Sequence, residues 1–176
     1  FPTRRSSDLE QMNPASYIAI PETSSEKRRY IPMGWLDDSV IPGNALHIIP
    51  DATLYDFGVL TSRVHMAWMR RVGGRLKSDY SYSNTIVYNT FAWPEPSAKQ
   101  RERIEQTAQG ILTARAAHPG NSFADLYDDT LMPEDLRRAH EKNDAAVCGA
   151  YGWREDVSEE EIVRRLFRLY HGLRGK

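Results

Sequence analysis

The 176-residue chain contains a single cysteine, Cys148, so an internal disulfide cannot form. Small secreted proteins usually carry several disulfides, and their absence favours a reducing compartment, here the cytoplasm. Long apolar runs are also missing. No stretch approaches the roughly 20 residues that a membrane-spanning helix needs, and no segment has the basic-then-apolar layout of a signal peptide. We therefore expect a soluble, cytoplasmic chain with no membrane partner.

An excess of either charge is lacking as well, because 23 Lys and Arg residues nearly balance 24 Asp and Glu residues. A net charge of −1 does not by itself indicate a nucleic-acid-binding protein. The distribution is uneven, however. Residues 61–83 hold five basic residues and one acidic residue, whereas residues 95–176 hold 13 basic and 15 acidic residues. A local basic stretch beside a slightly acidic segment is typical of a binding surface.

Recognisable catalytic motifs are absent too. The chain has no glycine-rich dinucleotide or phosphate loop, and its five histidines lack metal-ligand spacing with one another or with Cys148. Asn13 and Pro14 are followed by alanine, so the Asn-Pro-Pro-aromatic loop of amino methyltransferases is not present. Cys148 lies on an apolar helical stripe, which favours an inert buried thiol over a nucleophile. We predict no catalytic, cofactor-binding or metal-binding residue in this chain.

The first nine residues, FPTRRSSDL, resemble the peptide encoded by a common sequencing adapter translated in one frame. We interpret residues 1–9 as a disordered assembly artefact outside the fold, and the alternative is an ordinary disordered terminus. The adapter interpretation predicts that the natural protein continues upstream of Glu10.

Residues 10–94 predict a small mixed α/β unit with short strands. SYIAIP (16–21) and LHIIP (46–50) are apolar runs that end at proline and favour strands. Residues 81–87, which are rich in β-branched and aromatic side chains, favour a further strand or loop-strand.

Between these strands, apolar residues recur at helical spacing over residues 54–72. Thr61 or Ser62 can cap a helix there, and the pair of glycines that begins at Gly73 can end it. Basic residues just before these glycines suit the negative end of the helix dipole.

After two further prolines the chain becomes helical, over residues 95–176. Three helical segments are expected. The first and the last begin with capping-box patterns at Ser97 and Ser158, and the middle one begins at Pro133. All three carry apolar stripes. Three amphipathic helices with short connections favour a small bundle. The predicted fold class is therefore α+β, a recognition unit with short strands followed by a helical C-terminal subdomain.

The stretch GRLKSDYSYSNTIVYNTFAWP (74–94) is the most informative part of the chain. Arg75, Lys77 and Asp79 alternate, so in an extended strand they would share one face. A surface built only for phosphate would avoid a carboxylate. A lysine and an aspartate on one face can instead read a G·C pair, because the ammonium donates to guanine and the carboxylate accepts from the cytosine amino group.

An ordinary ion pair between Lys77 and Asp79 is the alternative, and spacing alone favours it. The side chains of Tyr80, Tyr82 and Ser83 could reach sugar and phosphate.

Two blocks of the sequence, SSEKRRYIPMGWLDDSVIPGNALHIIPDATLYDFGVLTSRVHMAWMRRVGGRLKSDYSYSNTIVYNTFAWP (24–94) and DLYDDTLMPEDLRRAHEKNDAAVCGAYGW (125–153), extend this picture. The first closely resembles the target-recognition segment of MmeI-like DNA methyltransferases, which are large type II restriction-modification proteins that modify adenine and in many cases also cleave DNA. The second resembles the helical segment that follows it.

The resemblance implies a parent enzyme that transfers a methyl group from S-adenosyl-L-methionine to a flipped adenine. The catalytic loop and the S-adenosyl-L-methionine site would lie upstream, with any nuclease domain further upstream still, so we expect the chain alone to be inactive. Its partners would be double-stranded DNA and the upstream methyltransferase domain of the same protein.

Within the resemblance, Lys77 and Asp79 match the part of the family's segment that varies with specificity, and we predict that they contact bases. The predicted contacts to the DNA backbone come from Arg70, Arg71, Arg75, Tyr80, Tyr82 and Ser83. The remaining alternatives are a non-catalytic DNA-specificity subunit and a stand-alone DNA-binding or protein-interaction module.

Overall fold

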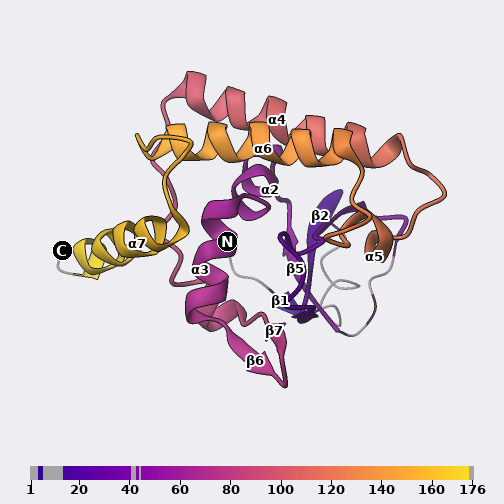
Figure 1. Cartoon of the computed structure of the whole chain (residues 1–176), viewed down its shortest axis with the longest axis horizontal. Coiled ribbons are helices and arrows are strands. Elements are labelled where there is room, and N and C mark those ends of the chain that lie inside the picture. The colour runs from indigo at the N-terminus through magenta and orange to yellow at the C-terminus, as the bar shows by residue number, and fades with distance from the viewer. Residues whose placement is uncertain (1–3, 6–13, 41–42, 44, 175–176) are drawn as a thin grey trace.

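A computed structural model of the protein describes residues 4–5, 14–40, 43 and 45–174. In Figure 1 two long helices, α4 and α6, lie side by side at the top, with α2 and α3 below them. A four-stranded sheet lies beside α2, a hairpin of β6 and β7 forms the lowest labelled part, and α7 projects to the left. Among the described residues no helix combines the length and the apolar character needed to cross a membrane.

The strands are β1 (Arg4–Arg5), β2 (Ser16–Pro21), β3 (Thr23–Ser24), β4 (Gly34–Asp37), β5 (Leu46–Pro50), β6 (Gly74–Leu76) and β7 (Asp79–Ser81). The helices are α2 (Leu54–Leu60), α3 (Arg63–Val72), the π-helical turn η2 (Asn84–Tyr88), α4 (Ala98–Ala116), α5 (Phe123–Leu126), α6 (Glu134–Ala150) and α7 (Glu159–Arg174). The predicted α+β class, with short strands first and helices after, is confirmed.

The larger sheet has the order β1-β5-β2-β4, and every neighbouring pair is antiparallel. The predicted strands at residues 16–21 and 46–50 are confirmed as β2 and β5. Both are buried on their two faces, with Ile18 facing the main core and Tyr17 facing a smaller apolar cluster. This double burial explains why they appear in the sequence as continuous apolar runs.

The segment predicted to lie outside the fold contributes two residues to this sheet. Arg4 and Arg5 form β1, opposite Ile48 and His47 of β5. The other seven of residues 1–9 lie outside the described residues, as does Asn13, and the origin proposed for the segment stays a prediction.

The helical spacing over residues 54–72 produces two consecutive helices, α2 and α3. Thr61 ends α2, while the Ser62 hydroxyl accepts a hydrogen bond from the His65 backbone N–H and so caps α3. Of the two candidate caps, Ser62 is therefore the one that begins a helix, and Gly73 ends α3 as predicted.

The prediction of a strand over residues 81–87 is wrong for most of its length. Only Ser81 belongs to a strand, and the chain then enters η2. The Ser83 hydroxyl accepts from the Ile86 backbone N–H at 3.3 Å and begins this turn. Serine and asparagine stabilise such turns by local hydrogen bonds, and here these bonds outweigh the strand preference of Thr85 and Val87.

The C-terminal helices do not form a bundle of their own, so this part of the prediction is also wrong. α4, with the predicted capping box at Ser97, packs against α6, and both cover α2. α7 instead packs on α3, where Trp68 meets Phe167 edge to face with ring centroids 4.9 Å apart. A single hydrophobic core therefore extends through both halves of the chain, from Ile18 to Leu166.

Asn143 of α6 joins the two halves beside Gly58, where α2 packs tightly on α4. Its amide donates to the Gly58 carbonyl at 2.7 Å, and its oxygen accepts from the Thr107 hydroxyl at 2.9 Å. The approach depends on glycine, because a Cβ atom at Gly58 would lie 2.6 Å from Ile104 Cγ2.

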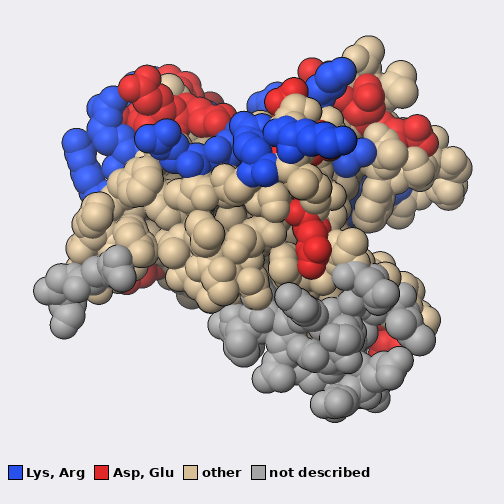
Figure 2. Space-filling view, turned by 90° about the horizontal axis from the view of Figure 1, so that it is seen from below, with Lys and Arg blue, Asp and Glu red and all other residues tan. Residues whose placement is uncertain are grey.

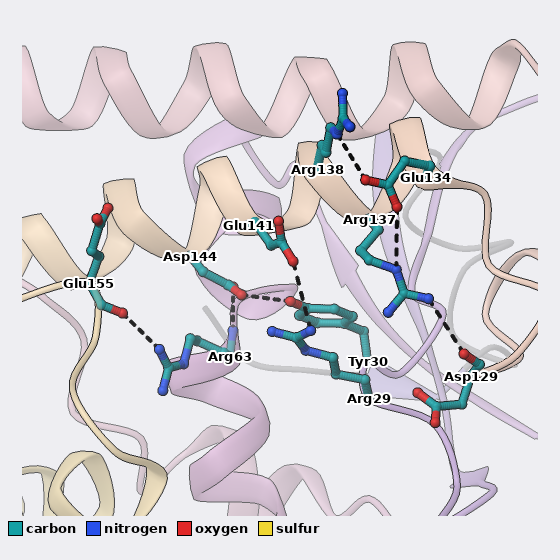
Figure 3. Close-up of polar contacts among 10 residues, drawn as sticks. All are labelled: Arg29, Tyr30, Arg63, Asp129, Glu134, Arg137, Arg138, Glu141, Asp144 and Glu155. Carbon is teal, nitrogen blue, oxygen red and sulfur yellow. Dashed lines mark hydrogen bonds and ion pairs between the residues drawn. The ribbon is translucent and has the colours of Figure 1, made fainter.

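Asp144, the next residue of α6, makes a second connection (Figure 3). One carboxylate oxygen accepts from the Tyr30 hydroxyl at 2.6 Å, and the other accepts from the Arg63 backbone N–H at 2.7 Å, at the start of α3. Burial raises the pKa of Asp144 to about 6, although these hydrogen bonds lower it in part. An exposed ion pair between Arg29 and Glu141, with nitrogen and oxygen 3.9 Å apart, lies beside the buried group.

We expect Gly58→Ala to lower the free energy of unfolding by about 1–3 kcal/mol, because the new methyl group collides with Ile104. Gly110→Ala is the matched control on α4, since a Cβ atom there meets no atom within 4 Å. That change should raise the free energy of unfolding by about 0.5–1 kcal/mol through helix propensity. Urea denaturation measures both, and equal effects of the two changes would contradict the packing assignment.

Asp144 should also make stability depend on pH. With a folded-state pKa of about 6 against an ordinary 3.8, the folded protein holds a proton that the unfolded chain has released. Asp144 therefore contributes fully to the free energy of unfolding below about pH 4. This contribution, at most about 3 kcal/mol, is lost as the pH rises to 6. The charged or titratable groups near Asp144 are Tyr30, Arg29, Arg63 and Cys148. Asp144→Asn should remove this slope in denaturation measured from pH 4 to 7, and an unchanged slope would refute the assignment.

Candidate nucleic-acid interface

The hairpin of β6 and β7 has a two-residue loop formed by Lys77 and Ser78. Its register pairs Arg75 with Tyr80 and Leu76 with Asp79. Lys77 has a φ of 58°, in the left-handed region that costs a non-glycine residue about 1 kcal/mol. The turn reverses the chain between Arg75 and Asp79.

The expected alternation of Arg75, Lys77 and Asp79 on one strand face is therefore wrong. Residues directly opposite each other in an antiparallel pair share a face. Asp79 shares its face with Leu76, and Arg75 shares the other face with Tyr80. Lys77 lies in the loop that joins the two strands.

Lys77 and Asp79 are both exposed at the end of the hairpin. Among the described residues, neither side chain makes a hydrogen bond or an ion pair, with the other or with any third residue. The alternative interpretation, an ordinary ion pair between them, is not what the structure contains. Both charged groups are thus available to an external ligand.

Arg75 is held in place by three contacts. Its guanidinium lies over the Tyr80 ring, 4.1 Å from the centroid, donates to the Ser78 carbonyl at 2.9 Å, and pairs with Glu26 at 3.7 Å. About half of the side chain stays exposed. Arg75 therefore braces the hairpin against the turn after β3 and still presents a cationic edge to solvent.

The two arginines at the end of α3 differ. Arg70 pairs with Glu159 of α7 at 2.9 Å and donates to the Arg29 carbonyl at 2.5 Å, so it joins α3 to α7. Arg71 is exposed and has no hydrogen bond or ion pair with another described residue. Only Arg71 of the two offers an unoccupied guanidinium.

Tyr80 and Tyr82, which were predicted to contact the DNA backbone, are buried because their rings pack in the core. Tyr80 is 8% exposed beneath Arg75, and Tyr82 is 3% exposed. The Tyr82 hydroxyl is hydrogen-bonded to His65 Nε2 at 2.9 Å, and burial raises its pKa well above the usual value. His47 of β5 contacts the Tyr82 carbonyl at 3.2 Å. Tyr82 therefore supports the hairpin from inside, and its hydroxyl does not face solvent.

Ser83 is half-buried, and its hydroxyl is occupied at the start of η2. The supporting histidines, His47 and His65, were not singled out from the sequence, because they come from β5 and α3 and no local pattern connects them with the hairpin. Cys148 is buried, and burial raises the pKa of its thiol to about 11, as expected for an inert thiol. No group of three or more His, Cys, Asp or Glu residues in the described part could hold a metal ion.

The hairpin lies on a basic face of the molecule. Seen from the hairpin side, Lys and Arg side chains form a band across the described surface (Figure 2). Exposed basic residues in and around the hairpin are Lys27, Arg71, Arg75 and Lys77. The hairpin belongs to a three-stranded sheet of order β3-β7-β6, and its end projects past β3, whose pairing with β7 stops at Tyr80. Exposed charges at this end, with basic residues around it, suit the groove and the phosphates of a duplex.

Comparison with known proteins identifies the family. Residues 2–95 match the family described as "MmeI, target recognition domain", and residues 96–176 match "MmeI, C-terminal domain". A curated relative, DNA methyltransferase A of Bacillus subtilis (strain 168), is 43% identical over 153 residues, which cover 87% of this chain and 17% of the relative.

A solved structure of the type IIL restriction-modification enzyme MmeI in complex with DNA is also similar. It superimposes with a TM-score of 0.88 at 46% identity, over 92% of this chain and 22% of that one. The chain thus spans about a fifth of the length of the proteins that it matches. The chain belongs to the MmeI family, as its target recognition domain followed by its C-terminal domain.

Proposed function

We propose that the chain is the DNA sequence-recognition part of a site-specific, adenine-specific DNA methyltransferase of the restriction-modification type. The support comes from the two family matches, from a relative named DNA methyltransferase, and from a similar enzyme solved with DNA. In this proposal S-adenosyl-L-methionine is the methyl donor of the enzyme and works in its methyltransferase domain. The 176 residues by themselves bind duplex DNA without transferring a methyl group, and they act in the cytoplasm.

The observation that carries the proposal is the pair of unpartnered charges at the end of the hairpin. Lys77 and Asp79 carry opposite charges two residues apart, yet neither pairs with the other or with another described residue, so both stay available to a ligand. Beyond the last β3 pair, at Tyr80, the end of the hairpin is two-stranded, and a two-stranded ribbon fits the major groove. There the Lys77 ammonium donates to a guanine edge, and the Asp79 carboxylate accepts from a cytosine amino group.

The surrounding residues divide into two roles. Arg71 and the exposed edge of Arg75 bind phosphates and set the register of the hairpin on the duplex. Arg70, Tyr80 and Tyr82 contribute to DNA binding indirectly, because they hold the hairpin and α3 in position from the protein side. Ser83 lies next to the same strand, and its proposed backbone contact requires its hydroxyl to leave the η2 cap.

The phosphate role of Arg71 predicts a defined salt effect. The chain should bind duplex DNA with an affinity that falls as salt rises, and Arg71→Ala should weaken binding to all sequences alike and reduce the salt slope by about 1. Lys142→Ala removes an exposed lysine of α6, a helix that lies at the opposite end of the molecule from the hairpin in Figure 1, and should leave the slope unchanged. Fluorescence anisotropy over a salt series gives both slopes, and binding that ignores salt would refute a DNA surface here.

The base-reading role of Lys77 and Asp79 predicts a change of specificity. The double variant Lys77→Glu with Asp79→Arg exchanges the positions of donor and acceptor, so the preferred base pair should change at one position of the target. Selection of bound duplexes from a randomised pool reads out the preference of each protein. An equal loss of affinity for every sequence would instead assign both residues to the DNA backbone.

A further inference from the structure

Leu76 is a large apolar side chain at the exposed end of the hairpin, where it is 60% exposed. Single exposed leucines are common on protein surfaces, so exposure alone does not indicate a function. The position of Leu76 is more informative, because it is the last residue of β6 and directly precedes the loop that carries Lys77.

The register of the hairpin decides which way Leu76 points. Leu76 lies directly opposite Asp79, so the two side chains share one face, with Cβ atoms about 5 Å apart. The other face carries Arg75 and Tyr80, and Tyr80 is buried beneath the Arg75 guanidinium. The face with Tyr80 therefore packs against the rest of the protein, and the face with Leu76 and Asp79 is directed toward solvent.

The major-groove edge of a pyrimidine presents two neighbouring features that match this outward face. Cytosine offers its N4 amino group beside C5, and thymine offers O4 beside its C5 methyl group. A carboxylate that accepts from an exocyclic amino group brings a neighbour on the same face close to a C5 position. Leucine is suited to that position, because its contact with the C5 edge is apolar.

We propose that Leu76 packs against the C5 edge of a pyrimidine in the major groove, at or beside the base that Asp79 contacts. This inference rests on the proposed function, and it adds a specificity-determining residue to the hairpin. Asp79 reads the exocyclic group, and Leu76 reads the presence or absence of a C5 methyl group. The chain should consequently respond to C5 methylation at one position of its target.

The test uses the 176-residue chain and the duplex that it prefers, selected from a randomised pool. Each thymine is replaced in turn by uracil, and each cytosine by 5-methylcytosine, so that only C5 methyl groups change. At one pyrimidine, loss of the methyl group should weaken binding about fourfold, or its gain should strengthen binding by a similar factor, as for one methyl group buried. Leu76→Ala should abolish this response and leave the salt slope unchanged, while Leu76→Met should keep it.

Leu131→Ala is the matched control, because Leu131 is a leucine of similar exposure, 64%, in the loop before α6. It should keep the full methyl response. The inference is overturned if no pyrimidine shows a methyl response, or if Leu76→Ala retains it. Absence of any duplex binding at low salt would overturn the proposed function itself, so the two failures can be distinguished.

Discussion

Two adjacent side chains of α6, Asn143 and Asp144, make the contact on which the rest of the structure depends. Asn143 holds α2 through the Gly58 carbonyl, and Asp144 holds the first backbone N–H of α3. Buried polar groups are costly unless they are paired. Asp144 is paired with Tyr30 and Arg63 of the other half, and Asn143 is paired with Gly58 of the other half and with Thr107 of α4. The C-terminal helices therefore serve as the support against which the recognition half is oriented, rather than as a separate unit.

α3 transmits this support to the surface. It is a helix of ten residues, about 15 Å long, that begins at Arg63, whose backbone N–H donates to Asp144, and ends at Val72, close to the start of β6. In the middle of α3 Trp68 packs on Phe167 of α7, and in its first turn His65 is hydrogen-bonded to Tyr82, which follows β7. The hairpin consequently rests on well-packed elements, as a surface that must present donors and acceptors in fixed positions requires.

The hairpin itself illustrates how far local sequence reasoning extends. Alternation drew attention to Lys77 and Asp79, but it placed them on one extended strand. Their separation depends on a turn at Lys77, a residue with no special preference for positive φ, so no turn signal was visible. The same limit applies to Tyr82, because its burial depends on His65 and His47 from distant segments.

The sequence by itself determined the two halves, the strands β2 and β5, the main helices with their serine caps, and the family to which the chain belongs. These features follow from local periodicity, capping and long runs of similar residues. Only the tertiary structure decided that α7 packs on α3 and not on α4 and α6. It also decided that residues 84–88 form a helical turn and which hairpin residues face outward. These outcomes depend on contacts between residues far apart in the chain, whose apolar stripes and polar groups have several possible partners until the core is assembled.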